Sequence, residues 1–389
     1  MTTTTRHDRR LTRRAVAAAA SLAFVAGTAQ YAGASTGTDE TDGGAQNSLQ
    51  AAWADDWALL GLENPGLEAT DLGITEVDTS EYQQEGPYTV GFASQGPTNS
   101  WATIYDETLR ARAEELGVEL AYAGADGRED KQVNDINDLL AQDIDALIVT
   151  PMGPAVTAPV ERAAAQGLPV IICTGTVDTD QYVARVDRDN RLNGALYAEW
   201  IAHEIDYEGS IVMLKGIPGV PTATAREEGA KEVFAQYPDI EILDEQYTNW
   251  SPTEAKTIME QLVTRFGDEI DAVWSDSGFG AIGTIQVYAE RGLEVPPVTG
   301  EPINGFLKLA DEHDVRFAAV GYPPTHSAAC LDAAVSALNG ETLQSFINVE
   351  VPIFDDTQIA DYVEPECSDD LWLPASNLSD ELLAELELC

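Results

Sequence analysis

Polar and aromatic side chains follow an apolar, β-prone run near the start of the regular part of this chain. The run beginning at Thr89 leads into "SQGPTNSW", so that Asn99, Ser100 and Trp101 stand directly before an amphipathic segment. An amide can donate a hydrogen bond to a hydroxyl group and accept one from it, and an indole offers a flat apolar face. These residue types predict non-covalent binding of a small polar molecule that has an apolar ring face.

Similar corners recur along the chain, each at the junction of a β-prone run and a helical segment. They place six further candidate ligand-binding residues, namely Thr174 in "CTGT", Arg226 in "TAREEG", Asp276 and Ser277 in "WSDSGFG", Glu301 in "TGEPINGF" and Tyr322 in "VGYPP". The guanidinium group of Arg226 can donate a forked pair of hydrogen bonds. Their recurrence at equivalent corners predicts one shared ligand site.

Each candidate also has an ordinary structural alternative. Asn99 and Ser100 could cap a helix, and Trp101 could belong to the hydrophobic core. Arg226 could pair with a neighbouring glutamate, and Glu301 could be solvated. The case for a ligand site therefore depends on the whole set and not on any single residue.

The elements that would position these corners alternate between short strands and helices of about a dozen residues. The predicted strands are 88–94, 118–123, 145–150, 169–174, 210–215, 240–246, 271–275 and 296–299, and the predicted helices are 101–116, 129–141, 155–166, 190–204, 223–236, 253–266, 279–291 and 303–311. The runs "DALIVTP" and "LPVIICTG" are apolar throughout, as in strands covered by helices on both faces of a parallel sheet. In such sheets, ligands bind beyond the carboxyl ends of the strands, where the corners lie.

Eight strand-helix units divide into two sets of four at the charged segment 184–194, and a last strand, helix and extended run follow. The prediction is an α/β fold with two doubly wound parallel-sheet lobes joined by a multi-crossing hinge. Lobe 1 would comprise 87–188 and 323–347, lobe 2 would comprise 189–322 and 348–356, and 357–389 would form a C-terminal tail. An eight-unit barrel is the alternative, but the charged break and the extra C-terminal elements argue against it.

The first 34 residues have the features of an export signal. Five arginines precede the apolar run "AVAAAASLAFVAG", which is too short to span a bilayer and ends near small residues. The stretch "TRRAVA" also fits a twin-arginine signal loosely, so the export route stays open. The signal leads us to expect a periplasmic or otherwise extracytoplasmic protein. Because no cysteine lies near the cleavage site, we expect no lipid anchor.

An acidic extension, residues 35–86, separates this signal from the regular part of the chain. It contains one amphipathic piece, in which Trp53, Trp57 and Leu60 recur at helical spacing. We expect that piece to dock on the chain's own surface, with a partner protein as the alternative.

Charge excludes several classes of partner. The chain has 67 acidic and 21 basic residues among 389, a net charge of −46, so a nucleic acid or an anionic membrane surface would repel it. A DNA-binding repressor would also need a basic headpiece, and residues 35–86 are acidic.

Four cysteines can pair in an exported chain. Three connectivities are possible, and a bridge between Cys367 and Cys389 around the acidic tail is the simplest. Cys173 lies inside an apolar run and is expected to be a buried thiol, which leaves Cys330 without an assigned partner.

Motifs for catalysis are lacking in the sequence. It contains no nucleophile elbow, no HExxH, no phosphate loop and no spaced metal ligands. We therefore expect no catalytic residue, no metal and no cofactor. A secreted hydrolase that uses a pair of carboxylates is the remaining enzyme alternative.

Several segments together resemble the type I periplasmic substrate-binding proteins of ABC importers, in the sugar branch related to ribose- and galactose-binding proteins. The resemblance covers about residues 88–354 and is carried by "NSW" after the first strand, "VDRDNRLNGALYAEWI", the pair "GIPG" and "AREEG", "DAVWSDSGFGAIGTIQVYAERG" and "PPVTGEPINGF". It implies a monomeric protein that closes on a sugar-like ligand and then docks on a membrane permease. A receptor for sensing or chemotaxis is the alternative within the same fold.

The resemblance also implies roles for individual residues. Asn99 and Trp101 match the hydrogen-bonding and stacking positions of the first lobe, and Arg226 matches the second-lobe arginine that holds ring hydroxyls. Ser277, Glu301 and Tyr322 fall where relatives place Asn, Asp and a polar residue at the crossing. One departure is Thr174-Gly175, which stands where the ribose type has an Asp-Arg pair. The ligand is therefore expected to be larger, less hydroxylated, or other than a simple pentose.

Overall fold

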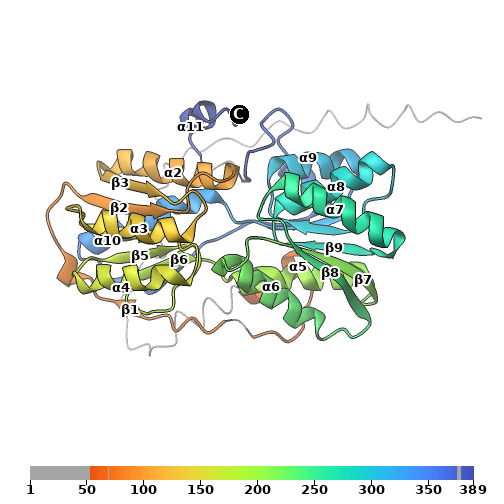
Figure 1. Ribbon diagram of the computed structural model, residues 1–389, viewed down its shortest axis with the longest axis horizontal. Helices are drawn as coiled ribbons and strands as arrows, with labels where there is room; N and C mark the ends of the chain where they lie inside the picture. The colour runs from red at the N-terminus through yellow and green to blue at the C-terminus, as the bar shows by residue number, and fades with distance from the viewer. Residues whose placement is uncertain (1–52, 69, 375–377) are drawn as a thin grey trace, which may run out of the picture. The chain divides into compact units, whose positions relative to one another are not determined.

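The computed structural model describes residues 53–68, 70–374 and 378–389, all within one compact unit, residues 42–389. Over these ranges the strands form two six-stranded sheets and one two-stranded ribbon. Figure 1 shows the two sheets with helices packed around each. The predicted fold of two doubly wound α/β lobes is thus confirmed. The predicted export signal, residues 1–34, lies outside the described residues.

The sheet of lobe 1 is parallel throughout, with strand order β13-β6-β5-β4-β2-β3. Its strands are β2 (Thr89–Ser94), β3 (Glu119–Gly124), β4 (Ala146–Val149), β5 (Val170–Cys173), β6 (Ala184–Asp187) and β13 (Phe346–Asn348). Its helices are α2 (Ser100–Leu116), α3 (Glu129–Leu140), α4 (Thr157–Ala165) and α10 (Ser327–Leu338), with short 3-10 turns η2 (Pro154–Val156) and η4 (Pro324–His326).

Helices cover both faces of this sheet, which explains its continuous apolar strands. In β4, Leu147 and Val149 pack with α3 and α4, whereas Ala146 and Ile148 pack with α2 and α10. All four side chains are fully buried. Successive side chains of a strand point to opposite faces of the sheet, and here both faces are covered by a hydrophobic layer. The strand is therefore apolar at every position.

The sheet of lobe 2 has the order β14-β11-β10-β9-β7-β8, and only its edge strand β14 is antiparallel to its neighbour. Its strands are β7 (Gly209–Lys215), β8 (Ile240–Tyr247), β9 (Ala272–Ser275), β10 (Val298–Gly300), β11 (Phe317–Val320) and β14 (Ile353–Asp355). Its helices are α5 (Asn190–Glu204), α6 (Pro221–Phe234), α7 (Pro252–Phe266), α8 (Gly278–Arg291) and α9 (Asn304–His313), with the 3-10 turn η3 (Gly267–Glu269) after α7.

Two glycines allow α5 and α6 to pack with their backbones in contact. A Cβ atom at Gly194 would overlap the backbone carbonyl of Arg226, and a Cβ atom at Gly229 would overlap that of Arg191. Any larger side chain would push the two helices apart. This contact fixes α6, the helix that carries Arg226, against the helix that begins lobe 2.

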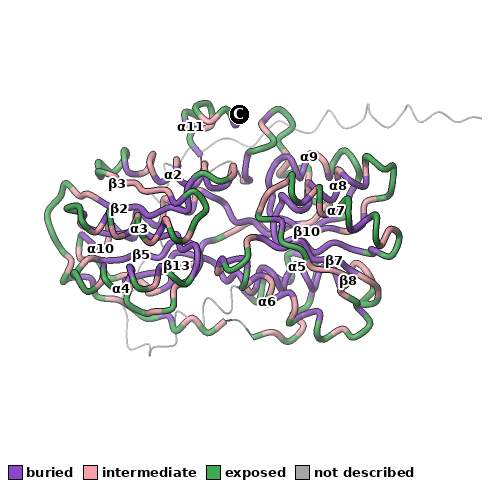
Figure 2. The backbone as a smooth tube through the Cα atoms, in the orientation of Figure 1, coloured by how far each residue is buried: buried purple, intermediate pink, exposed green. Residues whose placement is uncertain are grey.

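The described chain passes between the two sheets three times. It leaves lobe 1 after β6 and enters α5, returns after β11 into η4 and α10, and leaves again between β13 and β14. Figure 2 shows buried backbone where these segments run between the lobes. Several short crossings of this kind are typical of hinges that open and close a cleft.

The segment expected to be only a charged seam between the lobes begins with a strand. β6 completes lobe 1 by pairing with β5 on one side and β13 on the other. Sequence reasoning missed it because only Val183, Ala184 and Val186 supply the buried apolar side chains, and charged residues follow at once. The burial of Asp187 and Arg188 comes from tertiary contacts that no local pattern reveals.

The acidic extension docks on the chain itself, as expected for its amphipathic piece. Residues 53–59 are helical, and Trp53 and Trp57 are buried in the same core cluster as α5. Farther on, β1 (Glu76–Val77) pairs with β12 (Leu343–Gln344), and the 3-10 turn η1 (Ser80–Tyr82) precedes β2. The earlier part of the extension therefore contacts helices of lobe 2, and its later part contacts the C-terminal part of lobe 1.

All four cysteines form disulfides. Cys367 is bonded to Cys389, and Cys173 is bonded to Cys330. The expectation of a free thiol at Cys173 is wrong because α10 packs against β5 and brings Cys330 beside it. The bridge between Cys367 and Cys389 encloses α11 (Asp380–Glu385), and the 3-10 turn η5 (Asp356–Asp361) precedes it.

Replacing Trp57 by alanine should test whether the extension belongs to the lobe 2 core. The side chain is 2% exposed, so its truncation should lower the free energy of unfolding by about 3–5 kcal/mol in urea titrations. Leu59→Ala is the matched control, because this side chain lies in the same helical stretch and is 54% exposed. The control should change stability by less than about 0.5 kcal/mol. Equal effects of the two substitutions would contradict docking of the extension.

Candidate functional site

A cavity lies between the carboxyl ends of the strands of the two sheets. It encloses about 510 Å³ of empty space, including its opening to solvent. Lobe 1 contributes Gln95, Asn99, Trp101, Thr150, Pro151 and Thr174, lobe 2 contributes Val220, Thr222, Arg226, Trp250, Phe279 and Glu301, the second crossing contributes Tyr322, and the tail contributes Trp372. This is the position where ligands bind in open α/β sheets.

Arg226 is the charged centre of the cavity wall. Its side chain is 2% exposed, and its Nη2 atom lies 2.8 Å from Oε1 of Glu301. Nη1 donates a hydrogen bond of 2.8 Å to the backbone carbonyl of Asp276, and Nε donates one of 3.1 Å to Oδ1 of Asn190. The guanidinium carbon also lies 4.9 Å from the ring centroid of Tyr322. Each group comes from a different loop or crossing, so the fold of lobe 2 places this charge.

Burial shifts the ionisation of the acids beside Arg226. Burial raises the pKa of Glu301 to about 7, although the nearby guanidinium group acts to lower it. Burial also raises the pKa of Asp276 to about 6, again against the attraction of Arg226. For Arg226 itself, burial acts to lower the pKa, but the two acids outweigh it and the pKa is raised. The arginine thus stays charged, and its charge is balanced by carboxylates inside the protein.

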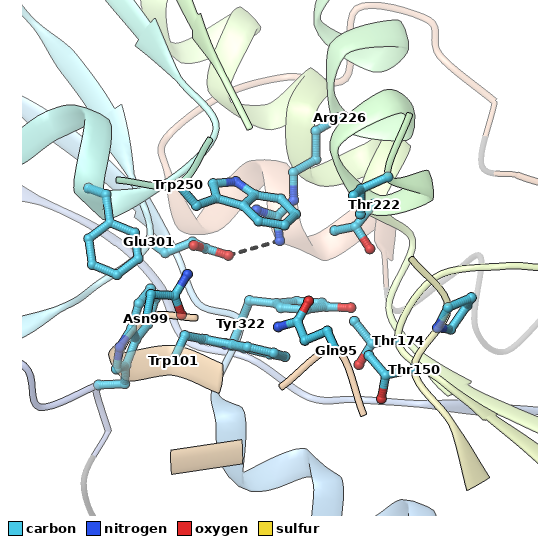
Figure 3. A pocket seen from close by; sticks show the side chains of 14 residues that line it. Gln95, Asn99, Trp101, Thr150, Thr174, Thr222, Arg226, Trp250, Glu301 and Tyr322 are labelled. Carbon is cyan, nitrogen blue, oxygen red and sulfur yellow. Dashed lines mark hydrogen bonds and ion pairs between the residues drawn. The ribbon is translucent and has the colours of Figure 1, made fainter. Parts of the chain in front are cut away.

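Aromatic rings form the opposite wall. The Trp101 ring stacks on Tyr105 at 4.7 Å and on Tyr322 at 5.9 Å between centroids, and its Nε1 donates a 2.7 Å hydrogen bond to the carbonyl of Tyr322. Figure 3 shows Trp101 and Tyr322 on one side of the cavity, with Trp250 and Arg226 on the other. The space between these groups therefore has two aromatic walls.

Hydrogen bonds from the crossings hold Tyr322 in place. Its hydroxyl group donates to Oδ1 of Asp187 at 2.5 Å, and the side-chain amide of Asn190 lies 3.5 Å from the same hydroxyl. Burial and the adjacent Asp187 carboxylate raise the pKa of Tyr322 well above its ordinary value, so the phenol stays neutral. Groups from the first two crossings thus meet at the cavity wall that contains Tyr322.

A second polar network lies behind the lobe 1 wall. The Thr174 hydroxyl lies 2.7 Å from Nε2 of His326, and the hydroxyl groups of Tyr105 and Thr150 lie 2.9 Å apart. Burial lowers the pKa of His326, which keeps its ring neutral. The network fixes Thr150 and Thr174 at the carboxyl ends of β4 and β5, where both line the cavity.

Six of the nine ligand-binding residues predicted from the sequence line this cavity: Asn99, Trp101, Thr174, Arg226, Glu301 and Tyr322. Asn99 also caps α2, since its Oδ1 accepts a hydrogen bond from the backbone N–H of Ala102. Its amide nitrogen is then the group left for a ligand. Arg226 pairs with Glu301 and not with the glutamates that follow it in sequence.

The other three predicted residues lie behind the cavity surface. Ser100 accepts a hydrogen bond from Nε1 of Trp372, and Ser277 precedes α8 with its hydroxyl group buried. Asp276 supports two wall residues, because its carbonyl binds Arg226 and its Oδ2 accepts a 3.2 Å hydrogen bond from Nε1 of Trp250. Ser100 and Asp276 thus hold residues of the wall in position.

Sequence reasoning missed eight lining residues: Gln95, Thr150, Pro151, Val220, Thr222, Trp250, Phe279 and Trp372. Trp250 had a usable signal, because "NWSPTEA" places a tryptophan between a strand and the start of a helix, close to the position of Trp101 in "NSWATI". Phe279 stands next to the predicted corner at Asp276. Trp372 had no local signal, because it lies in the tail and reaches the cavity only through tertiary folding.

The arrangement suits reversible binding of a neutral, polar molecule. Asn99, Gln95, Glu301 and the threonines offer donors and acceptors, and the aromatic walls offer apolar faces. An anionic ligand would compete with Glu301 for Arg226 and leave a carboxylate buried without its partner. Over the described ranges, no group of three or more His, Cys, Asp or Glu side chains is arranged to hold a metal ion.

Comparisons with known proteins find the same fold in solute-binding proteins. A family model described as a periplasmic binding protein domain matches residues 90–342. The chain is 28% identical over 203 residues to the xylitol-binding protein of Mycolicibacterium smegmatis, covering 52% of this chain and 58% of that protein. It is 27% identical over 215 residues to the galactofuranose-binding protein of Escherichia coli, covering 54% of this chain and 68% of that protein.

A solved structure of a periplasmic binding protein has a similar fold. The periplasmic binding protein component of the arabinose ABC transporter from Shewanella sp. ANA-3, bound to L-arabinofuranose, superposes with a TM-score of 0.65 at 26% identity. The superposition covers 70% of this chain and 93% of that one. The acidic extension and the C-terminal tail both lie outside the residues that the family model matches.

Replacing Glu301 by glutamine should change how stability depends on pH. The pKa of Glu301 in the folded protein is about 7 and its ordinary value is 4.5, so the folded state binds this proton more tightly than the unfolded chain does. The resulting stabilisation is complete below pH 4.5 and is lost as pH rises through 7, by up to about 1.4 kcal/mol per pH unit.

The free energy of unfolding of the wild type minus that of Glu301→Gln should therefore fall across this window. Urea titrations at several pH values from about 4.5 to 8 would measure this difference, in which groups that do not interact with Glu301 cancel. A difference that stays constant with pH would contradict the raised pKa.

Proposed function

The chain belongs to the periplasmic binding protein family, and from this premise we propose that it is the extracytoplasmic solute-binding component of an ABC importer. Its ligand in this proposal is a small neutral molecule, a sugar or a sugar derivative, held in the cavity between the lobes. The relatives named above bind a polyol or furanose sugars, and these ligands support the choice of ligand class.

One observation carries the proposal: a charge-balanced arginine faces an aromatic wall across a small cavity. Arg226 is neutralised by Glu301, so the site has hydrogen-bonding capacity without a net demand for a charged ligand. Trp101 and Tyr322 present ring faces on the other side. A sugar or polyol has this same division into hydroxyl groups and an apolar C–H face.

Capture in this proposal occurs by closure of the two lobes. Residues from both lobes and from the second crossing line one cavity, so a ligand there would contact groups that move relative to each other when the hinge opens. A micromolar affinity corresponds to about −8 kcal/mol. A few hydrogen bonds and one stacked ring can supply that amount, and no covalent step is required.

Delivery would require a membrane permease as partner. Members of this family act outside the cytoplasm and bind ligands for transport, which supports an exported, non-enzymatic role for this chain. Within the described residues, none of the helices is both long and apolar enough to cross a membrane. We propose that the protein works as a monomer and presents its closed form to the permease.

Isothermal titration calorimetry with xylitol, L-arabinose, D-ribose, D-galactose and myo-inositol tests this function. The wild type should bind at least one of these probes, and Arg226→Ala should weaken that binding by about 100-fold, because a buried charged hydrogen-bonding group is lost. Arg265→Ala is the matched control, since Arg265 is an exposed arginine of lobe 2 that does not line the cavity. It should leave the Kd within about twofold.

Trp101→Ala should also abolish or strongly weaken binding of the same probe. The substitution removes the ring that stacks beside Tyr322, so the ligand would lose its apolar contact. The circular dichroism spectrum and melting temperature of each unliganded variant show whether it remains folded. Unchanged affinity in folded Arg226→Ala and Trp101→Ala would reject the proposed site.

A further inference from the structure

The C-terminal strap, defined here as residues 362–374, is bound to lobe 2 through backbone hydrogen bonds. The N–H of Asn304 donates to the carbonyl of Leu371 at 2.8 Å, and the N–H of Gly305 donates to that of Asp369 at 2.9 Å. The N–H of Leu373 donates to the carbonyl of Pro302 at 3.0 Å. The strap therefore follows the start of α9 along the edge of the cavity.

Side-chain contacts reinforce this attachment. The amide nitrogen of Asn304 donates to the carbonyls of Glu364 and Ser368 at 2.8 and 2.9 Å, and its oxygen accepts from the N–H of Glu364 at 3.0 Å. The Cys367–Cys389 disulfide closes the tail on itself. A fully buried asparagine whose side chain makes several hydrogen bonds to one segment holds that segment in a defined position.

This strap brings Trp372 to the cavity. The side chain is 3% exposed, lines the cavity, and meets Phe279 edge to face at 5.6 Å between ring centroids. Its backbone forms a β-bridge with Ile303 of lobe 2. Its Nε1 donates a 3.2 Å hydrogen bond to Oγ of Ser100, at the start of α2 in lobe 1. One residue of the tail therefore spans the gap between the lobes beside the ligand space.

We propose that Trp372 is a ligand-binding residue and also a latch between the lobes. Its ring forms the wall between the N-termini of α2 and α8, where a ligand held by Arg226 and Trp101 would otherwise meet solvent. Its bond to Ser100 can form only when the lobes are as close as they are in this structure, so it favours this arrangement of the lobes over a more open one. Because the strap lies outside residues 90–342, this wall is an addition to the part of the chain that the family model matches.

The inference deepens the proposed function and rests on it. In the same calorimetric titrations with xylitol, L-arabinose, D-ribose, D-galactose and myo-inositol, Trp372→Ala should weaken binding of the probe that the wild type binds by about tenfold or more. Asp369→Ala is the matched control in the same strap, because its carboxylate is exposed and forms an ion pair with Lys308 at the surface. It should leave the Kd within about twofold.

Two conservative variants separate the latch from the wall. Trp372→Phe keeps a ring but loses the N–H donor, and Ser100→Ala loses the acceptor. Each should weaken binding by about two- to tenfold, and the double variant should be no weaker than the worse single variant, because both remove the same hydrogen bond. If the fold-changes in Kd of the two single variants multiply in the double variant, the hydrogen bond between Trp372 and Ser100 does not act as a latch. If Trp372→Ala fails to fold by circular dichroism, this cycle still decides whether Trp372 acts on binding.

The outcomes distinguish this inference from the function on which it rests. Absence of binding of every probe to the wild type would contradict the proposed function itself. If the wild type binds a probe, and folded Trp372→Ala binds the same probe with a Kd within about twofold of the wild-type value, only the role of Trp372 is overturned.

Discussion

The buried guanidinium group of Arg226 has to be neutralised inside the protein, and much of the site is arranged around that requirement. A charge at 2% exposure without partners would cost several kcal/mol, which is a large part of the stability of an ordinary domain. Glu301, Asp276 and Asn190 supply the partners, from the loops after β10 and β9 and from the first crossing. The site can thus form only when the lobe 2 sheet and that crossing are both in place.

The same constraint explains why the cavity is polar without being charged overall. Burial raises the pKa values of Glu301 and Asp276. The positive charge of Arg226 acts in the opposite direction and favours the ionised form of both carboxyl groups. The result is a set of donors and acceptors whose charges are satisfied before any ligand arrives. Aromatic rings from lobe 1 and the second crossing then complete the space with apolar faces.

Segments outside the common two-lobe fold brace the same region from both ends of the chain. In the extension, Asp56 forms a 2.7 Å ion pair with buried Arg188 at the first crossing, and Thr75 exchanges hydrogen bonds with Ser345 just before β13. In the tail, the strap carries Trp372 to the cavity edge. The first crossing and the cleft itself are therefore contacted by residues that precede or follow the matched domain.

The sequence by itself determined the features that depend on neighbouring residues. Continuous apolar runs identify the buried strands, and polar or aromatic residues at strand ends identify corners such as Asn99, Trp101 and Arg226. Tertiary structure decided what depends on contacts between distant segments: Arg226 pairs with Glu301 and not Glu227, Cys173 meets Cys330 on α10, and Trp372 enters the cavity. The physical reason is that periodicity and turn chemistry act within a few residues, whereas these pairings exist only after sheets, crossings and tail have packed together.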